Sequence, residues 1–165
     1  MIIREIRTED ANDYLNMMLG LDKETKFMLY EPNERSNNID PIKKMIEKNI
    51  EEENLFKVAI YNNQIVGFIC AQRGSLNRIR HTAYIVLGIR KQFRGKGIGK
   101  SFFKELDLWS KENNIKRLEL TVMCKNDIAK NLYEKNGFLI EGIKKKSVVV
   151  DGEYMDEFYM AKIYK

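Results

Sequence analysis

The stretch IVLGIRKQFRGKGIGK, residues 85–100, runs from an apolar segment into a glycine-rich turn. The apolar start is typical of a β-strand, and we expect a helix to begin at Gly97. The first N–H groups of a helix have no intrahelical partner, and the helix dipole adds partial positive charge there. Glycines let the backbone approach a phosphate closely, and the turn also carries three cations, Arg94, Lys96 and Lys100. Residues 94–100 therefore predict a phosphate or pyrophosphate site.

Two common phosphate-binding motifs do not fit this turn. The P-loop spacing GxxxxGK followed by Ser or Thr is absent, and the glycines at 95, 97 and 99 lack the GxGxxG spacing of a dinucleotide-binding turn. The alternative without a ligand is a tight strand-to-helix turn that binds nothing.

The part of the chain before residue 51 predicts a strand, a helix, a loop and a second helix. Residues 2–7 alternate weakly and predict the strand, while Thr8 is a candidate N-cap for a helix near residues 9–22. Residues 25–38 have no clear period and predict a surface loop. Asp40 and Pro41 are typical of a helix start. The apolar face of this second helix comprises Ile42, Met45, Ile46 and Ile50.

The rest of the chain predicts more strands than helices. Asn62-Asn63 and Asp151-Gly152 are typical two-residue hairpin turns. Asn126 is a candidate N-cap of a short helix that ends near Asn136. The other predicted elements are strands at 55–61, 64–73, 81–90, 117–123, 138–150 and 153–163, and a helix at 97–113 with Ile98, Phe102, Leu106 and Trp109 inward. This order predicts an α/β (α+β) chain whose mixed sheet carries helices on its faces.

Composition narrows the class of protein. A length of 165 residues without repeats or linkers predicts a single domain over residues 1–165. The net charge of +5 suits an anionic small ligand, and the absence of an arginine-rich stripe disfavours nucleic acid as a partner. No apolar run reaches the length of a membrane span and no signal peptide is evident, so we expect a cytoplasmic protein without a membrane partner. No cluster of metal ligands occurs, so no metal is expected.

Two segments together resemble one known family. Arg94-x-x-Gly97-x-Gly99 matches the Q/R-x-x-G-x-G/A motif of the GNAT acetyltransferases, and NDIAKNLYEKNGF, residues 126–138, is similar to the family's second signature. The resemblance implies a GNAT fold, a mixed, mostly antiparallel twisted sheet of six to seven strands with about four helices on its faces. It also implies acetyl-coenzyme A (acetyl-CoA) as cosubstrate, an amine acceptor and a homodimer.

The resemblance implies roles for particular residues toward the cofactor. The pyrophosphate of coenzyme A is expected on Arg94, Gly95, Lys96, Gly97, Ile98, Gly99 and Lys100. The pantetheine arm is expected along the backbone of Leu87 and Ile89, where an N–H group could stabilise the oxyanion of the tetrahedral intermediate. Asn126 is expected to contact pantetheine, or to act as a helix N-cap. Tyr133 is expected to protonate the leaving thiolate, or to be a core tyrosine.

A carboxylate is expected to accept the proton of the attacking amine. The resemblance favours Glu31 and Glu34, whose loop should border the acceptor site. Other candidates stay open in the last predicted hairpin, namely Asp151, Glu153, Asp156 and Glu157.

Three functions remain open at this point. The first is an N-acetyltransferase, a transferase of the acyltransferase class, that acts on a primary amine of a small molecule or of a protein or peptide. The second is a catalytically silent acyl-CoA-binding regulatory module. The third is a basic protein that binds RNA or ribosomes.

Overall fold

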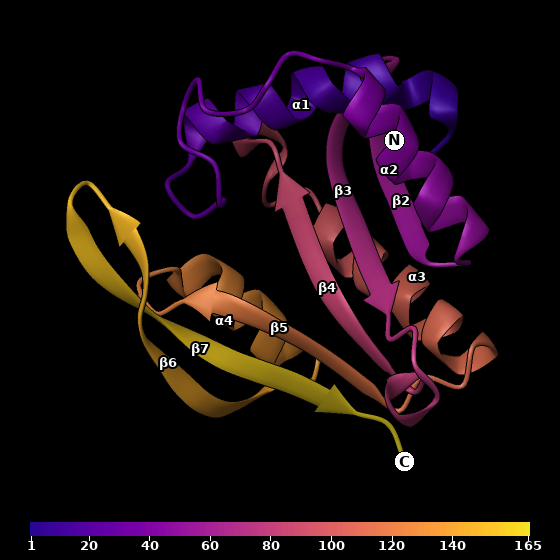
Figure 1. Ribbon diagram of the computed structural model, residues 1–165, viewed down its shortest axis with the longest axis vertical. Helices are drawn as coiled ribbons and strands as arrows, with labels where there is room; N and C mark the ends of the chain where they lie inside the picture. Colours follow the sequence, from indigo (N-terminus) through magenta and orange to yellow (C-terminus); the bar gives the residue numbers. More distant parts are fainter. The chain divides into compact units, whose positions relative to one another are not determined.

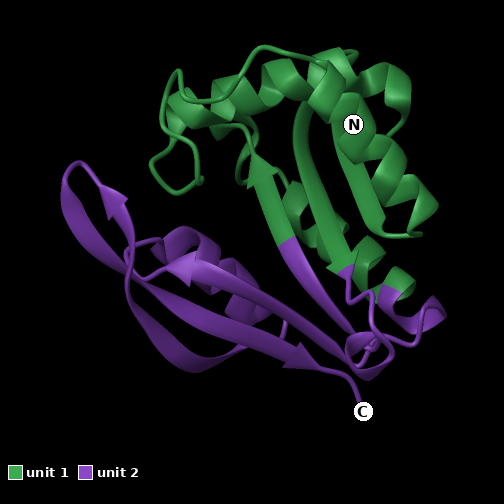
Figure 2. Ribbon diagram, in the orientation of Figure 1, with its two compact units in different colours: residues 1–72, 86–109 green, residues 73–85, 110–165 purple.

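The computed structural model describes residues 1–165 as two compact units (Figure 2). Unit 1 comprises residues 1–72 and 86–109, and unit 2 comprises residues 73–85 and 110–165. The division falls inside strand β4 (Thr82–Ile89) and inside helix α3 (Ile98–Glu112). The single domain expected over residues 1–165 therefore stays a prediction.

Seven strands form one sheet in the order β1-β2-β3-β4-β5-β7-β6. The β4–β5 pair is parallel, and the pairs β1–β2, β2–β3, β5–β7 and β6–β7 are antiparallel. The remaining elements (Figure 1) are β1 (Ile2–Glu5), α1 (Ala11–Glu24), α2 (Asp40–Glu51), β2 (Leu55–Tyr61), β3 (Gln64–Arg73), β5 (Arg117–Met123), α4 (Asp127–Lys135), β6 (Leu139–Val150) and β7 (Glu153–Ile163). The predicted fold class, a mixed and mostly antiparallel sheet with four helices, is confirmed.

Both predicted hairpin turns are present, for the reason that the sequence indicated. Asn62 and Asn63 have φ values of 47° and 60°, and Asp151 and Gly152 have values of 52° and 78°. Positive φ at both central residues is typical of the type I′ turn, whose twist matches that of the flanking strands. The turns therefore set the registers of β2 with β3 and of β6 with β7.

Unit 1 packs helices on both faces of β2. On one face the ring of Tyr14 from α1 meets Phe56 and Phe68 edge-on, with centroids 5.3 and 5.4 Å apart. On the other face the Lys57 ammonium lies 2.5 Å from the Glu105 carboxylate of α3. Because successive strand residues point to opposite faces, Phe56 and Lys57 face different helices. Figure 1 shows α2 and α3 on the two sides of these strands.

One predicted helix face was wrong at its end, and another is only partly buried there. Ile50 is 53% exposed, because α2 packs on the core through its earlier turns, where Ile46 is fully buried. Trp109 is only half-buried, since its indole N–H donates to the carbonyl of Glu53, 3.3 Å away, at the rim of the unit.

The first helix, predicted near residues 9–22, forms two residues later, and Thr8 is not its N-cap. A 3-10 turn, Thr8–Asp10, precedes α1, and Thr8 makes no side-chain cap. Instead the Asp10 carboxylate accepts the Arg7 N–H at 2.8 Å and two bonds from the Arg4 guanidinium at 2.7 and 2.8 Å. A charged acceptor satisfies the turn better than a hydroxyl does.

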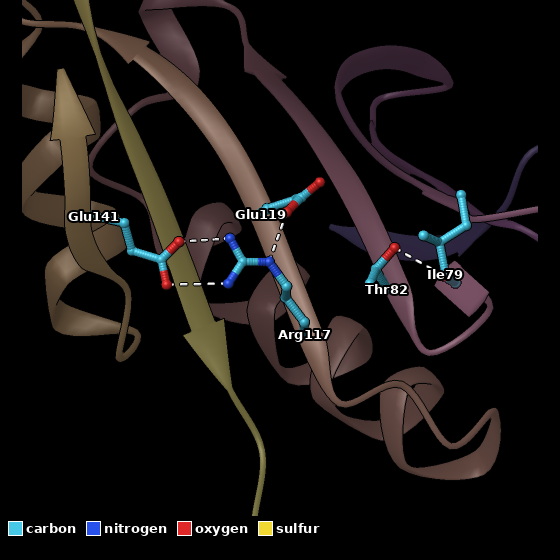
Figure 3. A network of polar contacts seen from close by, with 5 residues as sticks. All are labelled: Ile79, Thr82, Arg117, Glu119 and Glu141. Atoms are coloured by element: carbon cyan, nitrogen blue, oxygen red, sulfur yellow. Dashed lines mark hydrogen bonds and ion pairs between the residues drawn. The ribbon is translucent and has the colours of Figure 1, made fainter. Parts of the chain in front are cut away.

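Unit 2 contains an ion pair that crosses a strand (Figure 3). Arg117 of β5 donates two bonds to Glu141 of β6, 3.0 and 2.5 Å long, and a third to Glu119, 2.7 Å long. Strand β7 lies between β5 and β6, and the small residue Ala161 is paired with Glu119 at this level. The ion pair of Arg117 with Glu141 therefore links β5 to β6 across β7, the strand between them. Nearby, the Thr82 hydroxyl donates to the Ile79 carbonyl, 2.8 Å away, and closes the turn before β4.

Strand β6 is an edge of the sheet, and its pairing is interrupted. The register with β7 shifts between Lys144 and Val148, and Lys146 has a φ of 48°. A non-glycine residue with positive φ at a register shift marks a β-bulge.

No helix combines the length and the apolar character that crossing a bilayer demands.

Gly88 should be intolerant of a side chain. A Cβ atom there would lie 2.7 Å from Cε1 of Phe68 and 2.9 Å from Cδ1 of Leu21. We expect Gly88→Ala to lower the free energy of unfolding by about 1–3 kcal/mol through overpacking, measured by urea denaturation. Gly142→Ala is the control, since no atom lies within 4 Å of its Cβ position. Equal stability of the two variants would contradict this assignment.

Candidate functional site

The glycine-rich turn connects a 3-10 turn, Lys91–Phe93, to the first residue of α3, Ile98. Gly95 and Gly97 have φ values of +72° and +81°, which side chains rarely adopt. No atom lies within 4 Å of the Cβ position of either glycine. The N–H groups of the first turn of α3 have no intrahelical acceptor. The turn is thus open on its outer side and offers backbone donors there, as the sequence predicts for an anion site.

The three cations of the turn are exposed. The Arg94 guanidinium reaches back and donates to the carbonyl of Ile89, at 3.0 Å. The ammonium of Lys96 lies 5.2 Å from the ring centre of Phe93 and 6.0 Å from that of Tyr61. These contacts restrain two of the cations and keep positive charge beside the backbone donors.

Strand β4 ends beside the glycine-rich turn. Its register with β5 pairs Thr82–Tyr84 with Arg117–Glu119, and all of these residues belong to unit 2. Leu87 and Ile89 follow in unit 1 and are half-buried. The bond from Arg94 to Ile89 joins them to the turn. Unit 1 thus brings together Leu87, Ile89 and residues 94–100.

The second predicted group, Asn126 and Tyr133, lies in unit 2. The Asn126 side-chain oxygen accepts the N–H of Ala129 at 3.2 Å, so its predicted N-cap role is confirmed. Tyr133 is buried and its ring lies 5.8 Å from that of Phe138. Burial, reinforced by Tyr84, raises the pKa of Tyr133 to about 12. The phenol therefore stays protonated at neutral pH, where it can donate a proton but not accept one.

The two predicted acids Glu31 and Glu34 lie in unit 1, on the exposed loop of residues 25–38. The Glu34 carboxylate accepts the N–H of Glu31 at 2.9 Å, and the Glu34 N–H donates to the Glu31 carbonyl at 3.1 Å. Glu34 thus closes the turn that presents Glu31. Next in the chain, the Arg35 guanidinium donates two hydrogen bonds to the buried carboxylate of Asp22, 2.6 and 3.1 Å long. The Arg35 guanidinium carbon also lies 4.1 Å from the centre of the Tyr30 ring.

The alternative acids lie in the β6–β7 hairpin of unit 2. Asp156 accepts bonds from the Lys145 ammonium and the Lys146 N–H, both 2.8 Å long, which lower the pKa of its carboxyl. Glu157 accepts a hydrogen bond from the Ser147 hydroxyl. Local partners therefore engage Asp156 and Glu157, and at the hairpin tip the Glu153 carboxylate lies 4.0 Å from the Lys125 ammonium.

Residues that the sequence analysis did not single out support the turn and the loop. Glu24 contacts Arg90 and the backbone of Lys91, and Asp22 pairs with Arg35. No local pattern could reveal the first pair, because its members are 66 positions apart in the chain.

Comparisons with known proteins agree with the fold and with the two signatures. Residues 18–138 match the model of the acetyltransferase (GNAT) family. The chain is 31% identical over 110 residues to the L-amino acid N-acetyltransferase AaaT of Escherichia coli, an alignment of 64% of this chain and 66% of that protein. The chain thus spans slightly less than two thirds of this relative's length.

Two solved structures share the fold over nearly the whole chain. An acetyltransferase of the GNAT family from Streptococcus pneumoniae has a TM-score of 0.93 and 25% identity, with 99% of each chain covered. The protein yncA from Salmonella typhimurium, solved with its cofactor acetyl-CoA, has a TM-score of 0.87 and 16% identity, with 99% of this chain and 94% of that chain covered.

The two roles of Asn126 can be separated by one substitution. Serine is an equally good N-cap, so Asn126→Ser should change the free energy of unfolding by less than about 0.5 kcal/mol. If the Asn126 amide also contacts the cofactor, the Kd for acetyl-CoA should rise about fivefold. Urea denaturation and calorimetry measure the two quantities. An unchanged Kd would leave Asn126 with its capping role alone.

Proposed function

Because the chain belongs to the GNAT family of acetyltransferases, we propose that it moves the acetyl group of acetyl-CoA to a primary amine. Acetyl-CoA is the family's cosubstrate, and the Salmonella neighbour was solved with it. The observation that carries the proposal is the open glycine-rich turn at the start of α3, with its backbone donors and three cations. Such a turn suits a pyrophosphate group.

Each part of the coenzyme has candidate partners in this proposal. The pyrophosphate binds the N–H groups and cations of residues 94–100. In unit 1 the pantetheine arm binds the backbone of Leu87 and Ile89. In unit 2 the side chain of Asn126 is a separate candidate for contact with the cofactor. An N–H group at Ile89 stabilises the oxyanion that forms when the acetyl carbonyl is attacked.

The proposed reaction needs two proton transfers. The neutral amine nitrogen attacks the acetyl carbon and forms a C–N bond, while Glu31 accepts the proton that the nitrogen loses. The C–S bond then breaks, and the Tyr133 hydroxyl protonates the departing sulfur, so that an amide and coenzyme A remain. Burial raises the pKa of Tyr133 to about 12, so the phenol still holds its proton when the thiolate forms.

The loop of residues 25–38 supports a cationic acceptor with an apolar portion. Phe27, Leu29 and Tyr30 are 43%, 80% and 41% exposed, and Glu31 follows directly. The side chain of Glu34 adds a second negative charge nearby, on a chain whose net charge is +5. An ammonium group and an apolar substituent complement such a surface. Small amines and protein or peptide amines both remain within this proposal, as do a cytoplasmic location and a homodimer.

The cofactor site is tested by calorimetry with acetyl-CoA. We expect Gly97→Glu to weaken binding more than about tenfold, because the new carboxylate would occupy the phosphate position. Gly152→Glu is the matched control, since Gly152 also has a left-handed φ (+78°) and no atom within 4 Å of its Cβ position. It should incur the same backbone strain and leave the affinity unchanged. No binding by the unaltered protein would refute the proposal.

The catalytic groups are tested by pH–rate profiles with a panel of amines. We expect Glu31→Gln to lower kcat about 100-fold and to remove the ascending limb that a general base produces. Glu34→Gln should lower kcat less, because the Glu34 carboxylate already accepts the Glu31 N–H within the turn. Tyr133→Phe should lower kcat by about tenfold or more and keep that limb. Acetyl-CoA binding without transfer to any amine would favour the silent regulatory module instead.

A further inference from the structure

The end of α1 is clamped to the segment that leads into the glycine-rich turn. One carboxylate oxygen of Glu24 accepts the Arg90 Nε–H at 2.9 Å and lies 2.8 Å from Arg90 Nη2. The other oxygen accepts the backbone N–H of Lys91, at 2.8 Å. A single carboxylate thus holds both a side chain and the backbone at the point where β4 ends.

Arg90 is itself held from several sides. Its guanidinium covers Gly20 so closely that a Cβ atom there would lie 2.4 Å from the guanidinium carbon. The N–H of Arg90 donates to the Val66 carbonyl of β3, and its carbonyl accepts the N–H of Phe93, both at 2.9 Å. The position of Arg90 therefore sets the 3-10 turn Lys91–Phe93, from which the glycine-rich turn starts.

The contacts of the Glu24 carboxyl determine whether it is ionised. Burial opposes ionisation of Glu24, but the bonds from Arg90 and from the Lys91 N–H outweigh it and lower the pKa of the carboxyl. Glu24 is thus ionised at neutral pH and is compensated by Arg90. Arg94 also helps to lower the pKa of Glu24, while Lys96 and Lys100 keep positive charge in the turn.

We propose that Glu24 is a positioning residue, whose carboxylate holds the glycine-rich turn in its phosphate-binding conformation through Arg90 and Lys91. This inference rests on the proposed binding of acetyl-CoA. Glu24 touches no substrate, and it acts by fixing the backbone that does. Losing the clamp leaves the glycines free to sample other conformations, so part of the binding energy is spent on ordering the turn.

The chain contains a matched control for this clamp. Asp10 also accepts an arginine side chain, Arg4, together with a backbone N–H, that of Arg7. It lies in the same unit, between the end of β1 and the start of α1. Asp10→Asn therefore removes a comparable set of bonds away from the glycine-rich turn.

The experiment compares Glu24→Gln with Asp10→Asn. We expect Glu24→Gln to raise the Kd for acetyl-CoA about tenfold, as losing a hydrogen-bonded charge does, and to speed amide hydrogen exchange at residues 91–100. The KM for acetyl-CoA should rise while kcat stays within about twofold. Asp10→Asn should leave the Kd, the KM and exchange at residues 91–100 unchanged.

Equal Kd and equal exchange in the two variants would overturn the inference. If Glu24→Gln does not fold, Arg90→Lys tests the same clamp more mildly. It should raise the Kd about threefold, because lysine cannot supply both the Nε and the Nη2 donor, and an unchanged Kd would count against the inference. If the unaltered protein binds no acetyl-CoA, the proposed function fails. Exchange at residues 91–100 in the unliganded protein then decides separately whether Glu24 positions the turn.

Discussion

The left-handed backbone at Gly95 and Gly97 is the constraint on which the proposed site depends. A side chain at either position would disfavour the conformation that turns the chain from β4 into α3. The first N–H groups of α3, which have no intrahelical acceptors, follow directly after these two glycines, whose Cβ positions have no atom within 4 Å. One pair of dihedral angles thus serves chain reversal and anion recognition together.

Charge is divided along unit 1 in a way that suits two oppositely charged ligands. The glycine-rich turn carries only cations, Arg94, Lys96 and Lys100. The loop that follows α1 carries the carboxylates of Glu31 and Glu34 as well as two cations, of which Arg35 is paired with Asp22. The ion pair of the buried Asp22 with the half-buried Arg35 fixes the base of this loop, and its charges cancel one another. An anionic cofactor and a cationic acceptor can therefore be distinguished before any detailed fit is considered.

Local sequence signals predicted most of the fold, and long-range contacts explain what they missed. The Asn62-Asn63 turn and the Asn126 cap depend on neighbouring residues, so their chemistry could be read directly. The partners Glu24 and Arg90 come from distant segments, and only the folded chain brings them together. Ile50 shows a different limit, because periodicity identifies the apolar face of a helix and not how far the core extends beneath it.

The interruption of β6 has a consequence for behaviour in concentrated solution. An edge strand presents unpaired N–H and C=O groups, and a long apolar edge would recruit strands from other chains. In β6 the lysines at 144, 145 and 146 and the bulge at Lys146 divide that edge into two short pieces. A foreign strand could pair with only one piece at a time and would meet three lysine side chains between them. The bulge therefore acts as a local safeguard against fibrous aggregation.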